Sequence, residues 1–231
     1  KKGRDFEIKF SPHMGKKHGI LTNSGSSANL LMVTAATSRS HYRLPPESKG
    51  ITPVVCFPTT LNPILQNNLK PVFVDVELPS LNLDLDQVEK KLQEDPTIRA
   101  IMFAHVLGNP PDMDRLMDLV EEHNLLFLED ACDALGSFYD GKKLGSFGHM
   151  SSCSFFPAHH MTMGEGGFVA TNSNAVRTTL ASLRDWGRAC YCNSMKPGSV
   201  TQGTACGNRF QEWLPGMKGV TYDHRYVFNE I

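Results

Sequence analysis

Short apolar runs alternate with segments of helical periodicity along most of the chain. Short runs rich in β-branched and aromatic side chains are typical of strands, whereas apolar positions that recur every three or four residues are typical of helices. The pattern predicts strands at residues 18–23, 53–57, 71–76, 100–105, 125–130, 151–155 and 167–171. It predicts helices at residues 26–40, 60–68, 84–93, 112–123 and 174–186.

Strands that are joined mostly by helices favour a largely parallel sheet covered on both faces. We therefore expect an α/β fold in which a seven-stranded, mostly parallel sheet lies between helices. Residues 142–148 are expected to form a turn-rich loop. After Trp186 the periodicity gives way to Gly, Pro, Asn and Cys. We place one large domain at residues 1–188 and a cysteine-bearing loop region at residues 189–231, which leads toward a small C-terminal domain.

The composition changes this picture little. Hydrophobic residues make up 40% of the chain, and the formal net charge is −1. No basic patch indicates nucleic-acid binding, no apolar stretch approaches the roughly 18 residues of a membrane span, and no signal-peptide pattern is visible. We therefore expect a cytoplasmic protein without nucleic-acid or membrane partners. Because the chain starts at Lys1 and stops at Ile231 within a structured pattern, we interpret it as a fragment.

The first motif with chemical meaning is TNSGSSANLL, residues 22–31. A predicted strand runs into Gly25, Ser26 and Ser27, and a helix follows at once. Glycine permits a close backbone turn, and the free amides of a helix N-terminus attract anions. Taken alone, the serines favour an ordinary helix cap. Combined with the motifs below, the segment predicts a phosphate cradle.

The second motif is FLEDACDALGS, residues 127–137. Asp130 ends an apolar strand, which is where ligands gather in open α/β sheets. A carboxylate at that place can pair with a protonated pyridine nitrogen and maintain the electron-withdrawing character of the ring. Without other motifs, a loop aspartate that caps the next turn is the simpler interpretation.

The third motif is SFFPAHHMTMGEGG, residues 154–167. It resembles the cofactor-lysine segment of the sugar aminotransferases of the DegT/DnrJ/EryC1/StrS family, which are pyridoxal-phosphate enzymes. The family's lysine lies five residues after the serine and six before the glutamate, and both counts arrive at His159. No lysine lies between Lys143 and Lys196. Because a transaminase needs that amine to hold and recycle its cofactor, the resemblance implies a site that has given up transamination.

The resemblance implies the large domain of a fold-type I pyridoxal-phosphate-dependent transferase. The family's cofactor-binding residues correspond here to Gly25, Ser26, Ser27, Phe57, Asp130, Asp133 and Ser154. Ser154 matches a phosphate-contacting hydroxyl, and Asp130 matches the partner of the pyridine nitrogen. Phe57, at the end of the predicted strand 53–57, matches the aromatic that stacks on the ring, although a core phenylalanine is the alternative. Asp133 stands where the family usually has Gln or His near the ring hydroxyl.

The six cysteines divide into two groups. Cys56 and Cys153 lie inside predicted apolar strands and are interpreted as small core residues. The others are separated by gaps of 57, one and 13 residues, which suits a cluster or a metal better than disulfides in a cytosolic chain. This second group is Cys132, Cys190, Cys192 and Cys206.

These gaps resemble the iron–sulfur motif of the family's CDP-4-keto-6-deoxyglucose 3-dehydrases, in which they are 57, one and seven. The longer third gap implies an insertion around residues 195–202, and Cys206 stays the expected fourth ligand. The resemblance thus implies a 2Fe–2S cluster and a noncovalent pyridoxamine or pyridoxal 5'-phosphate. The expected substrate is a CDP-4-keto-6-deoxyhexose of the 3,6-dideoxysugar and O-antigen pathways. The expected partners are a second copy of the chain and a separate NAD(P)H-dependent flavin or iron–sulfur reductase.

A base must remove a proton from the cofactor's methylene group while the sugar loses its 3-hydroxyl, and we expect His159 to be that base. An unperturbed histidine is about three-quarters neutral at pH 7, against well under about 0.1% of a lysine. Two alternatives stay open. One is a colitose-type 3-dehydratase, which lacks the lysine but needs no cluster. The other is a noncatalytic aminotransferase homologue whose cysteines bind structural zinc.

Overall fold

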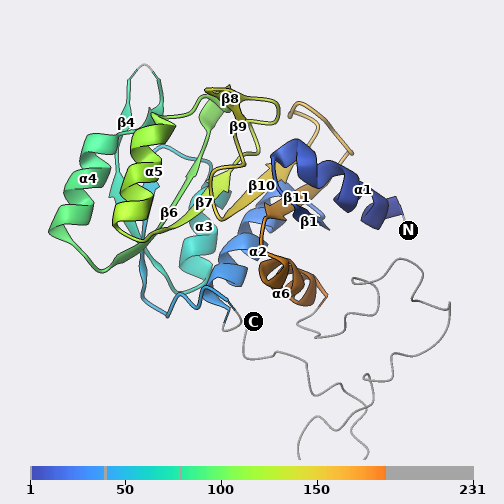
Figure 1. Cartoon of the computed structure of the whole chain (residues 1–231), viewed down its shortest axis with the longest axis horizontal. Helices are drawn as coiled ribbons and strands as arrows, with labels where there is room; N and C mark the ends of the chain where they lie inside the picture. The colour runs from blue at the N-terminus through green and yellow to red at the C-terminus, as the bar shows by residue number, and fades with distance from the viewer. Residues whose placement is uncertain (1, 39–40, 79, 186–231) are drawn as a thin grey trace, which may run out of the picture.

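The centre of the structure, a computed structural model, is a seven-stranded sheet in the order β1-β11-β10-β7-β6-β2-β3 (Figure 1). Residues 2–38, 41–78 and 80–185 are described, so the region predicted at 189–231, with Cys190, Cys192 and Cys206, lies outside them. Strand β11 is antiparallel to both β1 and β10, and the pairs from β10 across to β3 are parallel. The strands are β1 (His18–Thr22), β2 (Lys49–Pro53), β3 (Lys70–Val74), β6 (Ile98–Ala104), β7 (Leu126–Asp130), β10 (Met150–Ser154) and β11 (Gly167–Thr171).

Helices cover both faces of this sheet, which confirms the predicted fold class (Figure 1). One apolar core joins the sheet to α2, α3 and α6, and a second core joins the opposite face to α1, α4 and α5. The helices are α1 (Lys2–Phe10), α2 (Gly25–Thr37), α3 (Pro58–Gln66), α4 (Leu85–Glu94), α5 (Met113–Glu122) and α6 (Asn174–Arg184). The short elements are the 3₁₀ helices η1 (Ser11–Met14) and η2 (Val106–Gly108), and the hairpin strands β4 (Val76–Glu77), β5 (Asn82–Leu83), β8 (Phe138–Tyr139) and β9 (Lys142–Lys143).

None of the described helices is long and apolar enough to cross a membrane.

The strand predicted at 53–57 is wrong, because the strand of this region is β2, which ends at Pro53. Val54 and Val55 have the stronger strand propensity, yet they are 55% and 50% exposed. The chain leaves the sheet at this point to enter α3, which has Pro58 in its first turn. Position between two partner strands, rather than side-chain propensity, decides which residues form the strand.

Two other features were not expected from the sequence. Helix α1 was missed, because its apolar residues are few and Ile8 faces solvent. The predicted loop 142–148 begins with a short strand, β9, which pairs with β8. Both features lie on the face of the sheet that also carries α4 and α5 (Figure 1).

A buried group of charges lies on that face around Glu129 of β7. The Glu129 carboxylate accepts hydrogen bonds from the amides of Gly145 and Gly148 and lies 3.1 Å from Nε2 of His105. Burial pushes the pKa of Glu129 upward, but the hydrogen bond and charge of His105, with smaller contributions from Lys16 and Gly148, outweigh it and lower this pKa. Lys16 is also buried and donates to the carbonyl of Gly148. The network thereby fixes the loop after β9 to the central strand.

Replacing Lys16 by Met should change how the free energy of unfolding depends on pH. Burial lowers the pKa of Lys16 from 10.5 to about 8 in the folded chain, although the charge of Glu129 opposes this shift. Between these values the unfolded chain binds more protons, so the stability of the unmodified chain should rise with pH by about 2–3 kcal/mol relative to Lys16→Met. Urea denaturation at about pH 7.5 and about pH 10 measures this difference. If the free energy of unfolding changed equally with pH in the unmodified chain and in Lys16→Met, this prediction would be contradicted.

Candidate functional site

Three of the predicted site residues meet where α2 begins, beside the carboxyl end of β10. A Cβ atom built on Gly25 would lie 2.6 Å from Cβ and 2.9 Å from Oγ of Ser154, and 3.0 Å from Sγ of Cys132. Real Cβ atoms do not approach neighbours this closely, so only glycine fits. The structure therefore brings Gly25, Ser154 and Cys132 together from three distant parts of the chain.

The N-terminus of α2 presents free backbone amides at the same place. The helix is capped by Ser24, whose side chain accepts a hydrogen bond from the amide of Ser27 at 3.1 Å. The first intrahelical bond runs from the amide of Ala28 to the carbonyl of Ser24, so the amides of Gly25 and Ser26 precede it. Because Ser24 is the cap, Ser26 and Ser27 lie in the first turn of the helix, where their hydroxyls contact Oγ1 of Thr59 and Oγ of Ser24. This end of the helix has the polarity and the open backbone that an anion requires.

Asp130 lies at the end of β7, buried, with hydrogen-bond donors from three neighbouring elements. Its Oδ2 atom accepts from Nδ2 of Asn29 at 2.7 Å and from Oγ1 of Thr60 at 2.8 Å. Its Oδ1 atom accepts from the amide of Cys132 at 3.2 Å and lies 3.3 Å from Oγ of Ser152. The strand-end position predicted for Asp130 is confirmed.

The side chains that hold this carboxylate were not predicted from the sequence. Asn29 is buried and interrupts the apolar run of residues 28–33 in α2, and this contrast was a usable signal. Ser152 lies beside Asp130 in the paired strand β10, and its hydroxyl also contacts Oδ1 of Asn29 at 2.6 Å. Thr60 gave no such signal, because a threonine in the first turn of a helix is common.

His159 and Asp133 form a pair at the same edge of the sheet. Nδ1 of His159 lies 3.0 Å from Oδ1 of Asp133, and the two side chains are 22% and 45% exposed. His159 follows β10 and Asp133 follows β7, which is the parallel neighbour of β10. The next residue, His160, is exposed.

Phe57 differs from its predicted setting. It is the residue that precedes the first turn of α3, four positions beyond the end of β2, and it is 67% exposed. It is therefore neither at a strand end nor in the core. Thr60 of the same helix donates to Asp130, so Phe57 lies three residues before a residue that contacts the site.

The cysteines that the structure describes have distinct surroundings. Cys153 is fully buried in β10, which confirms it as a core residue, and burial raises the pKa of its thiol to about 12. Cys56 was expected in a strand, but it lies between β2 and α3 and is partly exposed. Cys132 lies 3.9 Å from Oγ of Ser152, and its thiol pKa is raised by burial and then by the charge of Asp130.

Among the described residues, no group of three or more His, Cys, Asp or Glu side chains could hold a metal ion. Of the four predicted cluster ligands, the structure describes only Cys132. The other three lie beyond residue 185, outside the described ranges. The predicted cluster stays a prediction.

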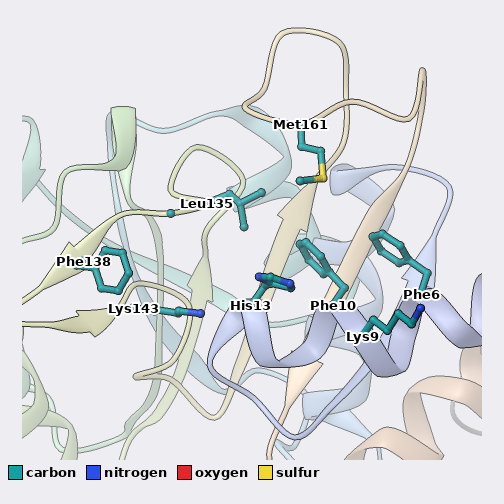
Figure 2. A pocket seen from close by; sticks show the side chains of 9 residues that line it. Phe6, Lys9, Phe10, His13, Leu135, Phe138, Lys143 and Met161 are labelled. Atoms are coloured by element: carbon teal, nitrogen blue, oxygen red, sulfur yellow. The ribbon is translucent and has the colours of Figure 1, made fainter.

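A pocket of about 400 Å³ lies on the α1 side of these loops (Figure 2). Phe6 and Phe10 of α1 line it from one side, and Leu135 and Met161 line it from the two loops that carry Asp133 and His159. Gly25, Asp130 and Ser154 do not line it, so it is distinct from the polar site at the start of α2.

Replacing Gly25 by Ala should displace Ser154 or the first turn of α2, because the added methyl group has no room. We expect a loss of about 1–3 kcal/mol in the free energy of unfolding, as for other overpacked positions. Gly50→Ala is the matched control, since its Cβ would lie 3.7 Å from its nearest neighbour, the Cβ of Ala100. That control should leave the stability unchanged or raise it slightly. Equal melting temperatures for both variants would contradict the packing described here.

Comparison with known proteins shows two curated relatives that this chain matches along nearly its whole length. It is 44% identical over 228 residues to the lipopolysaccharide biosynthesis protein RfbH of Salmonella typhimurium, covering 98% of this chain and 50% of that protein. It is 45% identical over 230 residues to a dTDP-4-dehydro-2,6-dideoxy-D-glucose 3-dehydratase of Saccharopolyspora spinosa, covering 99% and 48%. The chain thus spans about half the length of the curated relatives it matches.

Among solved structures, the fold is similar to that of the E. coli GDP-4-keto-6-deoxy-D-mannose-3-dehydratase with bound hydrated pyridoxal phosphate. The TM-score is 0.81 at 30% identity, over 94% of this chain and 56% of the other. The family described as the DegT/DnrJ/EryC1/StrS aminotransferase family matches residues 1–209. The resemblance carried by the three sequence motifs is therefore confirmed, and the chain belongs to this family.

Proposed function

We propose that this chain is the cofactor-binding part of an enzyme that removes the 3-hydroxyl group of a nucleotide-linked 4-keto-6-deoxyhexose. The observation that carries the proposal is that His159, which the motif resemblance assigns to the position of the cofactor lysine, lies beside Asp133 after the carboxyl ends of β7 and β10. Relatives named as sugar 3-dehydratases support this reaction class. The name of RfbH supports a role in lipopolysaccharide biosynthesis.

The residues at the site fit a noncovalent pyridoxamine or pyridoxal 5'-phosphate. The amides at the start of α2 and the hydroxyls of Ser27 and Ser154 offer donors to a phosphate. The Ser26 hydroxyl donates to Oγ1 of Thr59 at 3.2 Å and would have to turn to do so. Because Gly25 has no side chain, the start of α2 can pack directly against Ser154, which places the Ser154 hydroxyl beside the helix amides. When bound, the cofactor would supply an amine that condenses with a ketone and a ring that accepts electrons.

Asp130 retains an acceptor position for a protonated pyridine nitrogen. Its Oδ2 atom already has two donors, Asn29 and Thr60. The single hydroxyl proton of Ser152 can serve only one acceptor, and Oδ1 of Asn29 at 2.6 Å is closer than Oδ1 of Asp130 at 3.3 Å. Oδ1 of Asp130 accepts from the amide of Cys132, and the carboxylate also has a hydrogen bond from the Cys132 thiol, which a metal-bound thiolate would release for a further donor.

His159 would act as the base that takes a proton from the cofactor's methylene group. A neutral imidazole has an unprotonated ring nitrogen that can accept a proton, which makes histidine the commonest general base. Without a lysine at this position, the side chain at residue 159 holds no covalent link to the cofactor. Phe57, at the exposed start of α3, is proposed to cover the ring.

We further propose a 2Fe–2S cluster on Cys132, Cys190, Cys192 and Cys206. The gaps of 57 and one residue support it, and Cys132 is only two residues from Asp130. Replacing a hydroxyl group by hydrogen consumes two electrons and two protons and releases one water. The cluster would pass these electrons singly from a separate NAD(P)H-dependent flavin or iron–sulfur reductase. We also propose that the substrate is linked to CDP and that the enzyme is a homodimer.

A second function is favoured by one observation, which is the likeness to GDP-4-keto-6-deoxy-D-mannose-3-dehydratase. A colitose-type 3-dehydratase of this kind would use the same base and need no cluster. The cysteine spacing supports the first proposal over this one, and the iron content of the full-length enzyme distinguishes them.

Borohydride treatment of the full-length enzyme with pyridoxal phosphate should leave no pyridoxyl group on the peptide around His159 or on any lysine. His159→Lys should acquire such a group at residue 159, whereas His160→Lys, the matched control, should not. His159→Asn should keep cofactor binding but slow proton exchange at the cofactor's methylene about 10²- to 10⁴-fold. Mass spectrometry detects the pyridoxyl group, and NMR measures the rate of proton exchange. An adduct on a native lysine would show that the cofactor is held covalently elsewhere.

Serine substitution of any of the four proposed cluster ligands should abolish the visible iron–sulfur absorption of the full-length enzyme. Cys56→Ser is the control and should retain it. The ligand variants should still exchange the substrate's 3-hydroxyl oxygen with water, yet form no 3-deoxy product when the reductase and NAD(P)H are added. Net deoxygenation by a cluster-free variant without reductase would favour the colitose-type reaction. A cluster that survives Cys206→Ser would move the fourth ligand to another residue.

A further inference from the structure

We propose that Asp133 is a positioning residue that fixes the tautomer of His159, so that Nε2 is the basic atom. This inference rests on the proposed function, in which His159 is the base. Oδ1 of Asp133 lies 3.0 Å from Nδ1 of His159, within hydrogen-bond distance. A carboxylate only accepts, so a neutral His159 must carry its proton on Nδ1 in this pair.

The two side chains meet because the sheet brings their loops together. Ser152 of β10 pairs with Asp130 of β7 in parallel register. Asp133 lies three residues after the end of β7, and His159 lies five residues after the end of β10. Because the two strands are parallel neighbours, both residues lie at the same edge of the sheet. Leu135 and Met161, which follow in the same two loops, line one pocket (Figure 2).

The backbone around Asp133 is held in place independently of His159. Gly108 of η2 packs against it, and a Cβ on Gly108 would lie 3.1 Å from the carbonyl oxygen of Asp133. Gly108 also has a φ of +75°, which favours glycine. The amide of Ala134 donates to the carbonyl of Ala131 at 3.1 Å, which closes a turn around Asp133.

The loop of His159 is also ordered by its own contacts. The amide of His159 donates to the carbonyl of Phe156 at 3.0 Å, and the ring of Phe156 meets the imidazole edge-on, with centroids 6.3 Å apart. These contacts restrain the loop but do not choose between the two ring nitrogens. Among the contacts of the described residues, the one with Asp133 does so, and it leaves the lone pair on Nε2.

The pairing has two chemical consequences. An Nδ1–H donor directed at a carboxylate favours the neutral tautomer in which Nε2 is unprotonated and can act as the base. The negative charge of Asp133 also stabilises the imidazolium that forms when Nε2 takes a proton. His160 provides a contrast, since it is exposed and the described part of the chain shows no ion pair for it.

The tautomer can be read directly by ¹⁵N NMR of the ligand-free, full-length protein labelled at its histidines, at a pH where the imidazoles are neutral. Spectra of His159→Asn and His160→Asn assign the signals. His159 should be protonated on Nδ1, whereas His160 should show mainly the Nε2–H form of a solvated histidine. In Asp133→Ala the signal of His159 should move toward that of His160. A His159 protonated on Nε2 in the unmodified protein, or one unaffected by Asp133→Ala, would overturn the proposal.

Turnover provides the second measurement. Asp133→Ala should lower kcat on the order of 10- to 100-fold with little change in KM. Asp133→Asn preserves the size of the side chain and one acceptor oxygen, so it should fold normally and lose less activity. A changed tautomer with unchanged kcat would refute the positioning role. If the unmodified enzyme showed no 3-dehydrase turnover, the proposed function would fail, while the NMR result would still decide the tautomer.

Discussion

A buried carboxylate needs hydrogen-bond donors around it, and Asp130 imposes this requirement on all the elements that meet at the end of β7. Burying an uncompensated charge costs several kcal/mol, so the donors have to be placed accurately. Asn29 supplies one from α2, Thr60 supplies one from α3, and the amide of Cys132 supplies a third. The start of α2 and the start of α3 are thereby held close to a single point of the sheet.

Strand β7 also fixes neighbouring elements on the opposite face of the sheet. Successive side chains of a strand point to opposite sides, so Glu129 and Asp130 lie in different layers of the molecule. Glu129 binds the loop amides of Gly145 and Gly148 and meets His105, while Asp130 binds α2 and α3. A shift of one residue in the register of β7 would exchange two incompatible polar networks. The strand therefore aligns both helical layers with the edge from which Asp133 and His159 emerge.

The sequence was sufficient for the features that depend on local pattern. Hydrophobic runs and helix signals predicted the parallel sheet, and the strand-end position of Asp130 followed from its place after an apolar run. Features that depend on tertiary position could not be predicted in this way. Val54 and Val55 look like a strand but lie beyond β2, because the sheet selects the segment that fits between two neighbours. The contact between Asp133 and His159 likewise depends on the adjacency of β7 and β10, which no short stretch of sequence encodes.

The antiparallel strand β11 lies between β1 and β10, and it therefore decides when the site can be assembled. A Cβ on its first residue, Gly167, would lie 2.0 Å from the carbonyl oxygen of Ser24, so the cap of α2 packs directly on this strand. The ribosome makes β1 roughly 7 to 30 seconds before β11, at elongation rates of about 5–20 residues per second. During that interval β1 lacks this neighbour in the sheet, and pairing between such distant segments is slow. The nascent chain thus carries an unsatisfied strand edge, a surface on which chaperones or aggregation can act.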